Sequence, residues 1–252
     1  MAIMKCMQRL AMGLVVLTVT GFGAVAEDFT KSDIEGIVRD YLIANPEIIQ
    51  EAMVALEKKR RDAEDVARAT TIQNQSGILF NSVHQSELGN PKGDVTIVEF
   101  FDYNCSFCKR ALPDMMRLLE EDSELRIVMK EFPVLGQGSV EAAQVSVAVQ
   151  QLDPKKYLDF HATLISRRGQ ANKASALDVA EQVGFVRADV EKRIEEDGIN
   201  IPIEEVYALA NGLGLTGTPS YVIGDEVIMG AVGYDALKEK VQAFRQCGET
   251  TC

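Results

Sequence analysis

In this chain of 252 residues, the pattern that most strongly indicates a reactive site is a pair of cysteines with two residues between them, Cys105 and Cys108. If a helix begins there, they lie one turn apart. The first turn of a helix has unpaired N–H groups and partial positive charge, which stabilise a thiolate. A stabilised thiolate is both a nucleophile and a leaving group, so the pair suits thiol–disulfide exchange. We expect Cys105 to attack and Cys108 to resolve the resulting mixed disulfide.

Other uses of this pair stay open. It would also fit a permanent structural disulfide, or half of a zinc site completed by Cys247 and Cys252. Those two cysteines follow the last predicted helix, and in an oxidising compartment we expect them to form a local structural disulfide. A second redox pair or a metal-binding tail is the alternative for them. We expect no cofactor and no resident metal.

A buried strand and a helix must position the first pair. Residues 95–101 are a nearly continuous apolar run rich in β-branched side chains, as expected of a central strand. A helical pattern follows the cysteines to about residue 121, and residues 125–132 predict a second strand. The sequence therefore predicts a β-α-β unit with Cys105 at the first strand-to-helix junction.

The rest of the main domain is predicted from shorter patterns. Residues 78–80 read as a short apolar strand, and residues 137–213 show only helical periodicity. Apolar runs at 221–223 and 227–229 flank a turn and predict a hairpin. A last helix is expected over residues 235–246.

The N-terminus has the pattern of a secretory signal peptide. Lys5 and Arg9 precede a short apolar run, and small residues precede a predicted cleavage site after Ala26. An N-terminal membrane anchor is the alternative. Cleavage would remove Cys6, leaving four cysteines in an exported chain, and we expect that chain to be periplasmic.

Residues 27–76 predict two helices with a narrow apolar stripe. Ile34, Val38 and Tyr41 fall at helical spacing, and Asn45-Pro46 marks the start of the second helix. Such helices bury little surface alone, so they must pack on the main domain or on copies of themselves. The net charge of −12 disfavours nucleic acid and acidic membrane surfaces as partners.

Residues 95–246 resemble the DsbA-like branch of the thioredoxin superfamily. The matching features are Glu99-Phe100-Phe101, the two cysteines, the helical insertion at about 137–213, and Thr218-Pro219 before the hairpin. The resemblance implies that residues 77–246 form an α/β domain with a thioredoxin fold, into which the all-helical segment is inserted. A helical stalk precedes this domain and a tail, residues 247–252, follows it.

The same resemblance implies roles for individual residues. Pro219 would be cis and lie beside the catalytic cysteine, where it and Thr218 hold the substrate; a trans turn proline is the alternative. Ser106 and Phe107, between the cysteines, would also face substrate. Because neither is histidine, we expect a weaker oxidant than the histidine-containing family members.

A buried acid–base pair is a further implication. Glu99 precedes Cys105 by six residues, and the resemblance pairs it with a lysine on the next strand, for which Lys130 fits. Such a pair would accept and return the proton of Cys108 during exchange. Surface positions for both side chains are the alternative.

Residues 29–70 are similar to the N-terminal region of the "suppressor of copper sensitivity" C proteins, which implies oligomerisation through this region. We therefore predict a periplasmic thiol–disulfide oxidoreductase that forms or isomerises disulfides in exported proteins, as an oligomer. A monomeric oxidase recharged by a membrane redox partner is one alternative. A non-catalytic copper-binding or chaperone protein is the other.

Overall fold

A computed structural model describes residues 29–252 of the chain. The predicted signal peptide, residues 1–26, and Cys6 lie outside the described residues. Among the helices of the described part, none is long and apolar enough to cross a membrane. The chain divides into two packing units, one ending at Leu56 and the other spanning Glu57–Cys252. The division falls inside the second helix, whereas the sequence placed it near residue 76.

The first unit contains α1 (Lys31–Ala44) and the start of α2 (Glu47–Asn74). Thr30 begins α1 with a capping box: its hydroxyl accepts from the Asp33 N–H, and the Asp33 carboxylate accepts from the Thr30 N–H at 3.0 Å. No side chain of α1 is buried. Within this unit, the apolar side chains of α1 therefore remain exposed to solvent.

A five-stranded sheet organises the second unit, in the order β1-β3-β2-β4-β5. Only β2 and β3 run parallel; the other neighbours are antiparallel. The strands are β1 (Ser86–Gly89), β2 (Val95–Phe101), β3 (Leu125–Glu131), β4 (Ser220–Ile223) and β5 (Glu226–Met229). The predicted central strand, β2, lies in the middle of the sheet, and the predicted hairpin is β4–β5.

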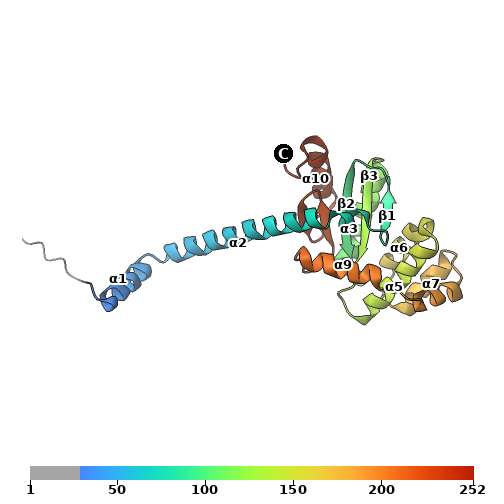
Figure 1. Cartoon of the computed structure of the whole chain (residues 1–252), viewed down its shortest axis with the longest axis horizontal. Helices are drawn as coiled ribbons and strands as arrows, with labels where there is room; N and C mark the ends of the chain where they lie inside the picture. The colour runs from blue at the N-terminus through green and yellow to red at the C-terminus, as the bar shows by residue number, and fades with distance from the viewer. Residues whose placement is uncertain (1–28) are drawn as a thin grey trace, which may run out of the picture. The chain divides into compact units, whose positions relative to one another are not determined.

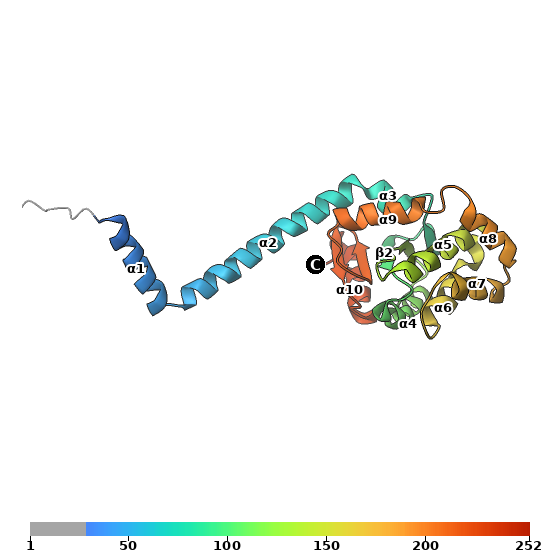
Figure 2. The same cartoon turned by 90° about the horizontal axis from the view of Figure 1, so that it is seen from below.

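Helices cover both faces of this sheet (Figures 1 and 2). On one face, α3 (Ser76–Asn81), α9 (Ile201–Gly212) and the end of α2 pack over Phe100 and Val128. On the other face lie α4 (Ser106–Glu121) and α10 (Tyr234–Cys247). The sheet is therefore buried on both sides, which explains why β2 lacks polar–apolar alternation.

The remaining helices lie between β3 and β4 in sequence, as the helical pattern predicted. They are α5 (Gln137–Leu152), the short 3₁₀ turn η1 (Pro154–Lys156), α6 (Tyr157–Ser166), α7 (Lys173–Gln182) and α8 (Arg187–Glu195), followed by α9. Of these, α5, α6, α7 and α8 share one apolar core with α4 and α10. The predicted α/β class with an all-helical insertion is confirmed.

The predicted strand at residues 78–80 is wrong, because these residues lie in α3. Leu79 is fully buried against the sheet, and a short apolar run alone does not distinguish a buried helical turn from a strand. The strand that precedes β2 is instead β1, whose Ser86 pairs with Met129 of β3. Its sequence, Ser-Glu-Leu-Gly, has no β-branched residue to indicate a strand.

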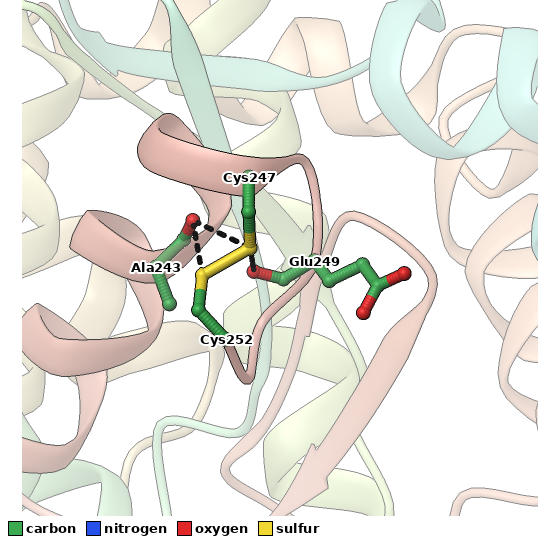
Figure 3. The surroundings of a disulfide bond; sticks show 4 residues. All are labelled: Ala243, Cys247, Glu249 and Cys252. Atoms are coloured by element: carbon green, nitrogen blue, oxygen red, sulfur yellow. Dashed lines mark hydrogen bonds between the residues drawn. A yellow bond between two sulfur atoms is a disulfide. The ribbon is translucent and has the colours of Figure 1, made fainter.

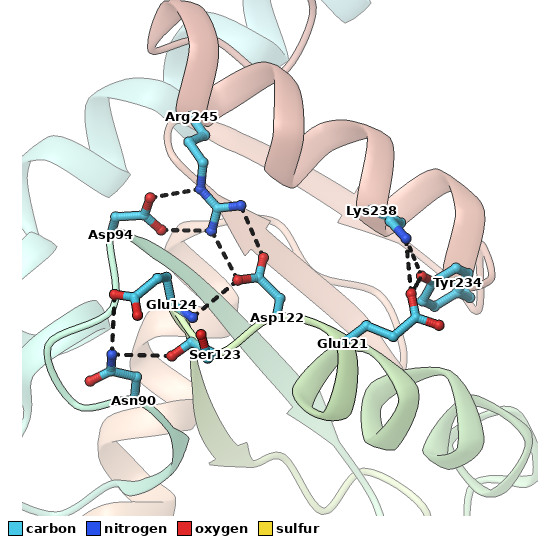
Figure 4. Close-up of polar contacts among 9 residues, drawn as sticks. All are labelled: Asn90, Asp94, Glu121, Asp122, Ser123, Glu124, Tyr234, Lys238 and Arg245. Atoms are coloured by element: carbon cyan, nitrogen blue, oxygen red, sulfur yellow. Dashed lines mark hydrogen bonds and ion pairs between the residues drawn. The ribbon is translucent and has the colours of Figure 1, made fainter.

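Ionic contacts join α10 to the residue before β2 and to the end of α4 (Figure 4). Arg245 donates to both carboxylate oxygens of Asp94, at 2.6 and 2.7 Å, and to Asp122 at 3.0 Å. Nearer the start of α10, Tyr234 and Lys238 both donate to Glu121. The bidentate geometry makes the Arg245 contact more specific than a single surface ion pair.

Candidate active site

The two cysteines lie where β2 passes into α4. Cys105 is the N-cap residue of α4, and Cys108 lies in its first turn. Both thiols are free, and only 6% of Cys105 and 1% of Cys108 is exposed. The helix start therefore presents its unpaired N–H groups and partial positive charge to Cys105, the more accessible of the two.

The loop before β4 lies directly beside Cys105. The Cys105 Sγ donates to the carbonyl oxygen of Thr218 at 3.1 Å, and the Thr218–Pro219 peptide bond is cis. Between the cysteines, Ser106 and Phe107 are exposed, Phe107 by 53%. Thr218 thus contacts the Cys105 thiol directly, and Pro219, Ser106 and Phe107 follow these two residues along the chain.

Two buried glutamates with raised pKa values lie in the sheet, and Glu99 is the one close to the cysteines. Burial raises the pKa of Glu99 to about 8, and no hydrogen bond to its carboxyl group is found within residues 29–252. Burial also raises the pKa of the Cys108 thiol, with the charges of Cys105 and Glu99 adding to the effect. Cys108 therefore needs a nearby acceptor for its proton before it can act as a thiolate.

The predicted pairing of Glu99 with Lys130 is wrong. In the parallel register, Glu99 lies beside Met129, whereas Lys130 lies beside Phe100 on the opposite face of the sheet. Lys130 Nζ donates to the carbonyl of Ile78 at 2.8 Å and lies 3.7 Å from Glu205. Burial lowers its pKa to about 8, but on a face that Cys108 does not share.

Sequence reasoning missed the residue that shapes the cysteine loop, Asp102. Its buried carboxylate accepts from the N–H groups of Asn104 (2.7 Å), Val134 (2.8 Å) and Leu135 (2.9 Å) and from the hydroxyl of Ser139 (2.8 Å). It therefore ties the cysteine loop to the segment after β3. The available signal was an acid directly after a buried strand, three residues before Cys105.

Asn104 makes the next connection. Its amide nitrogen donates to the Ala171 carbonyl at 3.0 Å, and its amide oxygen accepts from the Ala171 N–H at 2.7 Å. This two-point contact fixes the α6–α7 loop against the cysteine loop. No sequence pattern indicated it, because the partner lies in the helical insertion, far along the chain.

The second buried acid, Glu131, lies beside Phe101 in the sheet and bonds a polar cluster instead of the cysteines. Burial raises its pKa to about 8, although Ser146 and Tyr157 donate hydrogen bonds to it. Tyr103 bonds Ser146 at 2.8 Å and lies 3.3 Å from Nδ1 of His161. His161 is itself buried, which lowers its pKa to about 3.

The other cysteine pair, Cys247 and Cys252, forms a disulfide at the end of α10 (Figure 3). Their Cα atoms are 6.4 Å apart, and both residues are exposed. Gly248, in the left-handed conformation at φ 79°, ends the helix between them. Within residues 29–252, no three histidine, cysteine or acidic side chains gather into a metal-binding group.

Two family models match the chain. The DSBA-like thioredoxin domain matches residues 96–242, and the copper resistance protein ScsC N-terminal domain matches residues 31–63. The first match spans the cysteines, the helical insertion and the β4–β5 hairpin. The second spans α1 and the first half of α2.

Solved structures agree with the first match. A thioredoxin-like oxidoreductase from Silicibacter pomeroyi DSS-3 is 38% identical and superposes with a TM-score of 0.65, covering 68% of this chain and 98% of its own. The thiol-disulfide exchange protein alpha-DsbA2 from Wolbachia pipientis is 30% identical, with a TM-score of 0.68 and coverages of 72% and 98%. Proteus mirabilis ScsC in a transitional conformation is 30% identical, with a TM-score of 0.64 and coverages of 86% and 96%.

Proposed function

The chain belongs to the family of DsbA-like thioredoxin domains, whose members are thiol–disulfide oxidoreductases, and from this we propose that it forms or isomerises disulfides in exported proteins of the periplasm. The observation that carries the proposal is Cys105 at the start of α4, with its thiol 3.1 Å from the Thr218 carbonyl. This geometry places the more exposed of the two sulfurs beside a backbone segment that a substrate strand can pair with.

The reaction proceeds by two exchanges at sulfur. As a dithiol, Cys105 attacks a substrate disulfide, forming a mixed disulfide and releasing one substrate thiolate. Cys108 then attacks the Cys105 sulfur, so the second substrate thiolate leaves and the Cys105–Cys108 disulfide forms. Run in reverse, the oxidised pair oxidises a substrate dithiol, and a membrane redox partner restores the disulfide. Isomerisation ends at the mixed disulfide, when a second substrate cysteine displaces Cys105.

Glu99 supports the second exchange as the proton acceptor of Cys108. Its pKa of about 8 lets it exist in either protonation state near neutral pH, and its carboxyl has no competing partner within the described residues. The proton passes from the Cys108 thiol to the Glu99 carboxylate as the sulfur attacks. Lys130 takes no part, because it faces the other side of the sheet.

Refolding of ribonuclease tests the activity. The protein is added to reduced ribonuclease to measure oxidation and to scrambled ribonuclease to measure isomerisation, with a Cys105→Ser variant as control. We expect recovery of ribonuclease activity in at least one assay and none with the variant. Failure in both assays, combined with Cu(I) binding that Cys105→Ser abolishes, would favour the copper-binding function instead.

We also propose that the first packing unit joins copies of this chain. The exposed apolar side chains of α1 include Ile34, Ile37, Val38 and Tyr41, each at least 50% exposed. An amphipathic helix that buries no side chain within its own unit gains stability by burying this stripe against another copy. The match of residues 31–63 to the ScsC N-terminal domain supports this assignment.

Sedimentation equilibrium tests the assembly. The chain beginning after Ala26 is compared with its Ile37→Glu variant and with a Lys31→Glu control, in which an exposed charged residue of the same helix changes. We expect an oligomer that Ile37→Glu dissociates and Lys31→Glu leaves intact. A monomer at every concentration would contradict the proposal and favour the monomeric oxidase.

A further inference from the structure

The surface beside Cys105 differs in charge from the rest of the chain. The whole sequence has 38 acidic residues against 26 lysines and arginines. The segments 104–110 and 166–173 contain five cations and no aspartate or glutamate. We call these cations the basic rim: Lys109, Arg110, Arg167, Arg168 and Lys173.

Hydrogen bonds hold both segments of the rim against each other. Asn104 bonds the backbone of Ala171 at two points, as described above. Lys109 Nζ, on the first turn of α4, donates to the Arg167 carbonyl at 2.9 Å. Because Asn104 precedes Cys105 directly, the backbone of the α6–α7 loop, which carries both arginines, is fixed against the cysteine loop.

Most of the rim's charge is unneutralised. Arg167 lies 3.5 Å from Asp178, and the carboxylate of Glu141 accepts from the backbone N–H of Lys173. Within residues 29–252, none of the other four cations has a carboxylate within ion-pair distance. Arg110 instead lies over the Phe107 ring, 4.3 Å from its centre, and both side chains are exposed.

A fixed group of solvated cations attracts negative charge and raises the rate of encounter with it. At physiological ionic strength the attraction extends about 8 Å, which is two to three residues of extended chain. A substrate acid therefore feels the rim at Cys105 only if it lies within about three residues of the reacting cysteine.

We propose that the basic rim selects protein substrates or redox partners whose reactive cysteine is flanked by aspartate or glutamate. This inference rests on the proposed exchange activity and adds a substrate class to it. On the other side of Cys105, the backbone of Thr218 offers contacts that do not depend on substrate sequence, so the rim supplies the discrimination by charge.

Three single-cysteine peptides test the proposal, with two acidic, two neutral or two basic residues flanking the cysteine. Each peptide reacts with the oxidised protein, and its rate is divided by its own rate with the uncharged hydroxyethyl disulfide. This division removes the effect of flanking charge on the peptide's own thiol. We expect the normalised rate to be about 10-fold higher for the acidic than for the basic peptide at low salt. In 1 M salt the ratio should approach one.

A pair of double variants assigns the effect to the rim. Arg110→Gln with Arg168→Gln should lower the acidic-to-basic ratio at least about 3-fold. Lys92→Gln with Lys155→Gln removes the same amount of positive charge from two exposed positions. Lys92 precedes β2 and Lys155 precedes α6, so each lies at the end of its element that is far from Cys105. This variant should leave the ratio unchanged. A ratio near one in the unmodified protein, or an equal loss in both doubles, overturns the proposal. If the protein exchanges with none of the peptides and not with hydroxyethyl disulfide, the proposed function fails, and this inference with it.

Discussion

The two cysteine pairs of this protein occupy opposite ends of helices. Cys105 begins α4, where unpaired N–H groups and the positive end of the helix dipole face its sulfur. Cys247 ends α10, where unpaired carbonyl groups and the negative end of the dipole disfavour a thiolate. The first pair is present as two free thiols and the second as a disulfide.

Burial separates the two pairs as well. Cys108 is 1% exposed, and its thiol loses a proton only if a neighbour such as Glu99 accepts it. Cys252, by contrast, lies in an exposed tail, and its sulfur is bonded to that of Cys247. The same residue type is thus made reactive or inert by its place on a helix and by its acid–base neighbours.

The largest expected effect comes from the cysteines of α4. Cys105→Ser should abolish exchange, because a serine hydroxyl is not a nucleophile toward sulfur at neutral pH. Cys108→Ser should stop the reaction at the mixed disulfide with Cys105, since nothing resolves it. Non-reducing gel electrophoresis and mass spectrometry after mixing with a substrate protein measure the trapped adduct.

The tail pair provides the matched control for this experiment. Cys247→Ser with Cys252→Ser should retain at least half of the exchange rate of the unmodified protein. A trapped adduct on Cys247, or loss of exchange in the tail variant, would contradict the assignment of the redox function to α4.

These local features were predictable because neighbouring residues encode them. The spacing of Cys105 and Cys108, the apolar run of β2 and the turn between β4 and β5 all appear within a few residues. The family resemblance then indicated Pro219, which lies far along the chain.

Features that depend on strand register were not predictable in this way. The pairing of Glu99 with Lys130 failed because β2 and β3 pair Glu99 with Met129, and a shift of one residue moves a side chain to the other face. The contact of Asp102 with Val134 depends on the path of the chain after β3, and that of Asn104 with Ala171 on the packing of the helical insertion.

The second prediction concerns Glu99 and its matched control, Glu131. Both have a pKa of about 8 in the folded protein, raised by burial from an ordinary value near 4.5. The folded state therefore holds a proton that the unfolded chain releases, and stability falls as pH rises from about 4.5 to 8. Glu99→Gln should remove on the order of 4 kcal/mol of this loss. Urea unfolding at pH 5 and pH 8 measures the difference.

Activity distinguishes the two acids. Glu99→Gln should slow the resolving step at least 10-fold, because glutamine cannot accept the Cys108 proton. Glu131→Gln should flatten the pH dependence of stability similarly but leave exchange unchanged, since Glu131 bonds Ser146 and Tyr157 instead. Equal effects of both variants on the exchange rate would show that the rate depends on the loss of a buried acid in general and not on proton transfer to Glu99.

The third prediction concerns the loop that carries Cys105. Asp102→Asn keeps the size of the side chain but places an NH₂ group against donors that now bond the carboxylate. We expect a loss of about 3 kcal/mol in the free energy of unfolding, from one or two buried donors left unpaired. Chemical denaturation of the reduced protein measures it, and Asn104→Asp is the comparison variant on the same loop. No change in stability would mean that the contacts of Asp102 contribute little to holding the loop.

The smallest effect is expected at the tail disulfide. It closes a loop of only six residues, so the chain-entropy estimate limits its contribution to about 2 kcal/mol. The tail leaves α10 after Cys247, and the contacts of Arg245 with Asp94 and Asp122 hold the helix independently of the bridge. Cys247→Ser with Cys252→Ser should therefore lower the midpoint of thermal unfolding by a few degrees at most. Arg245→Gln in the same background should add a separate loss. If the serine variant instead failed to fold, the disulfide would be essential to the stability of the domain, which would contradict the small structural role assigned to it here.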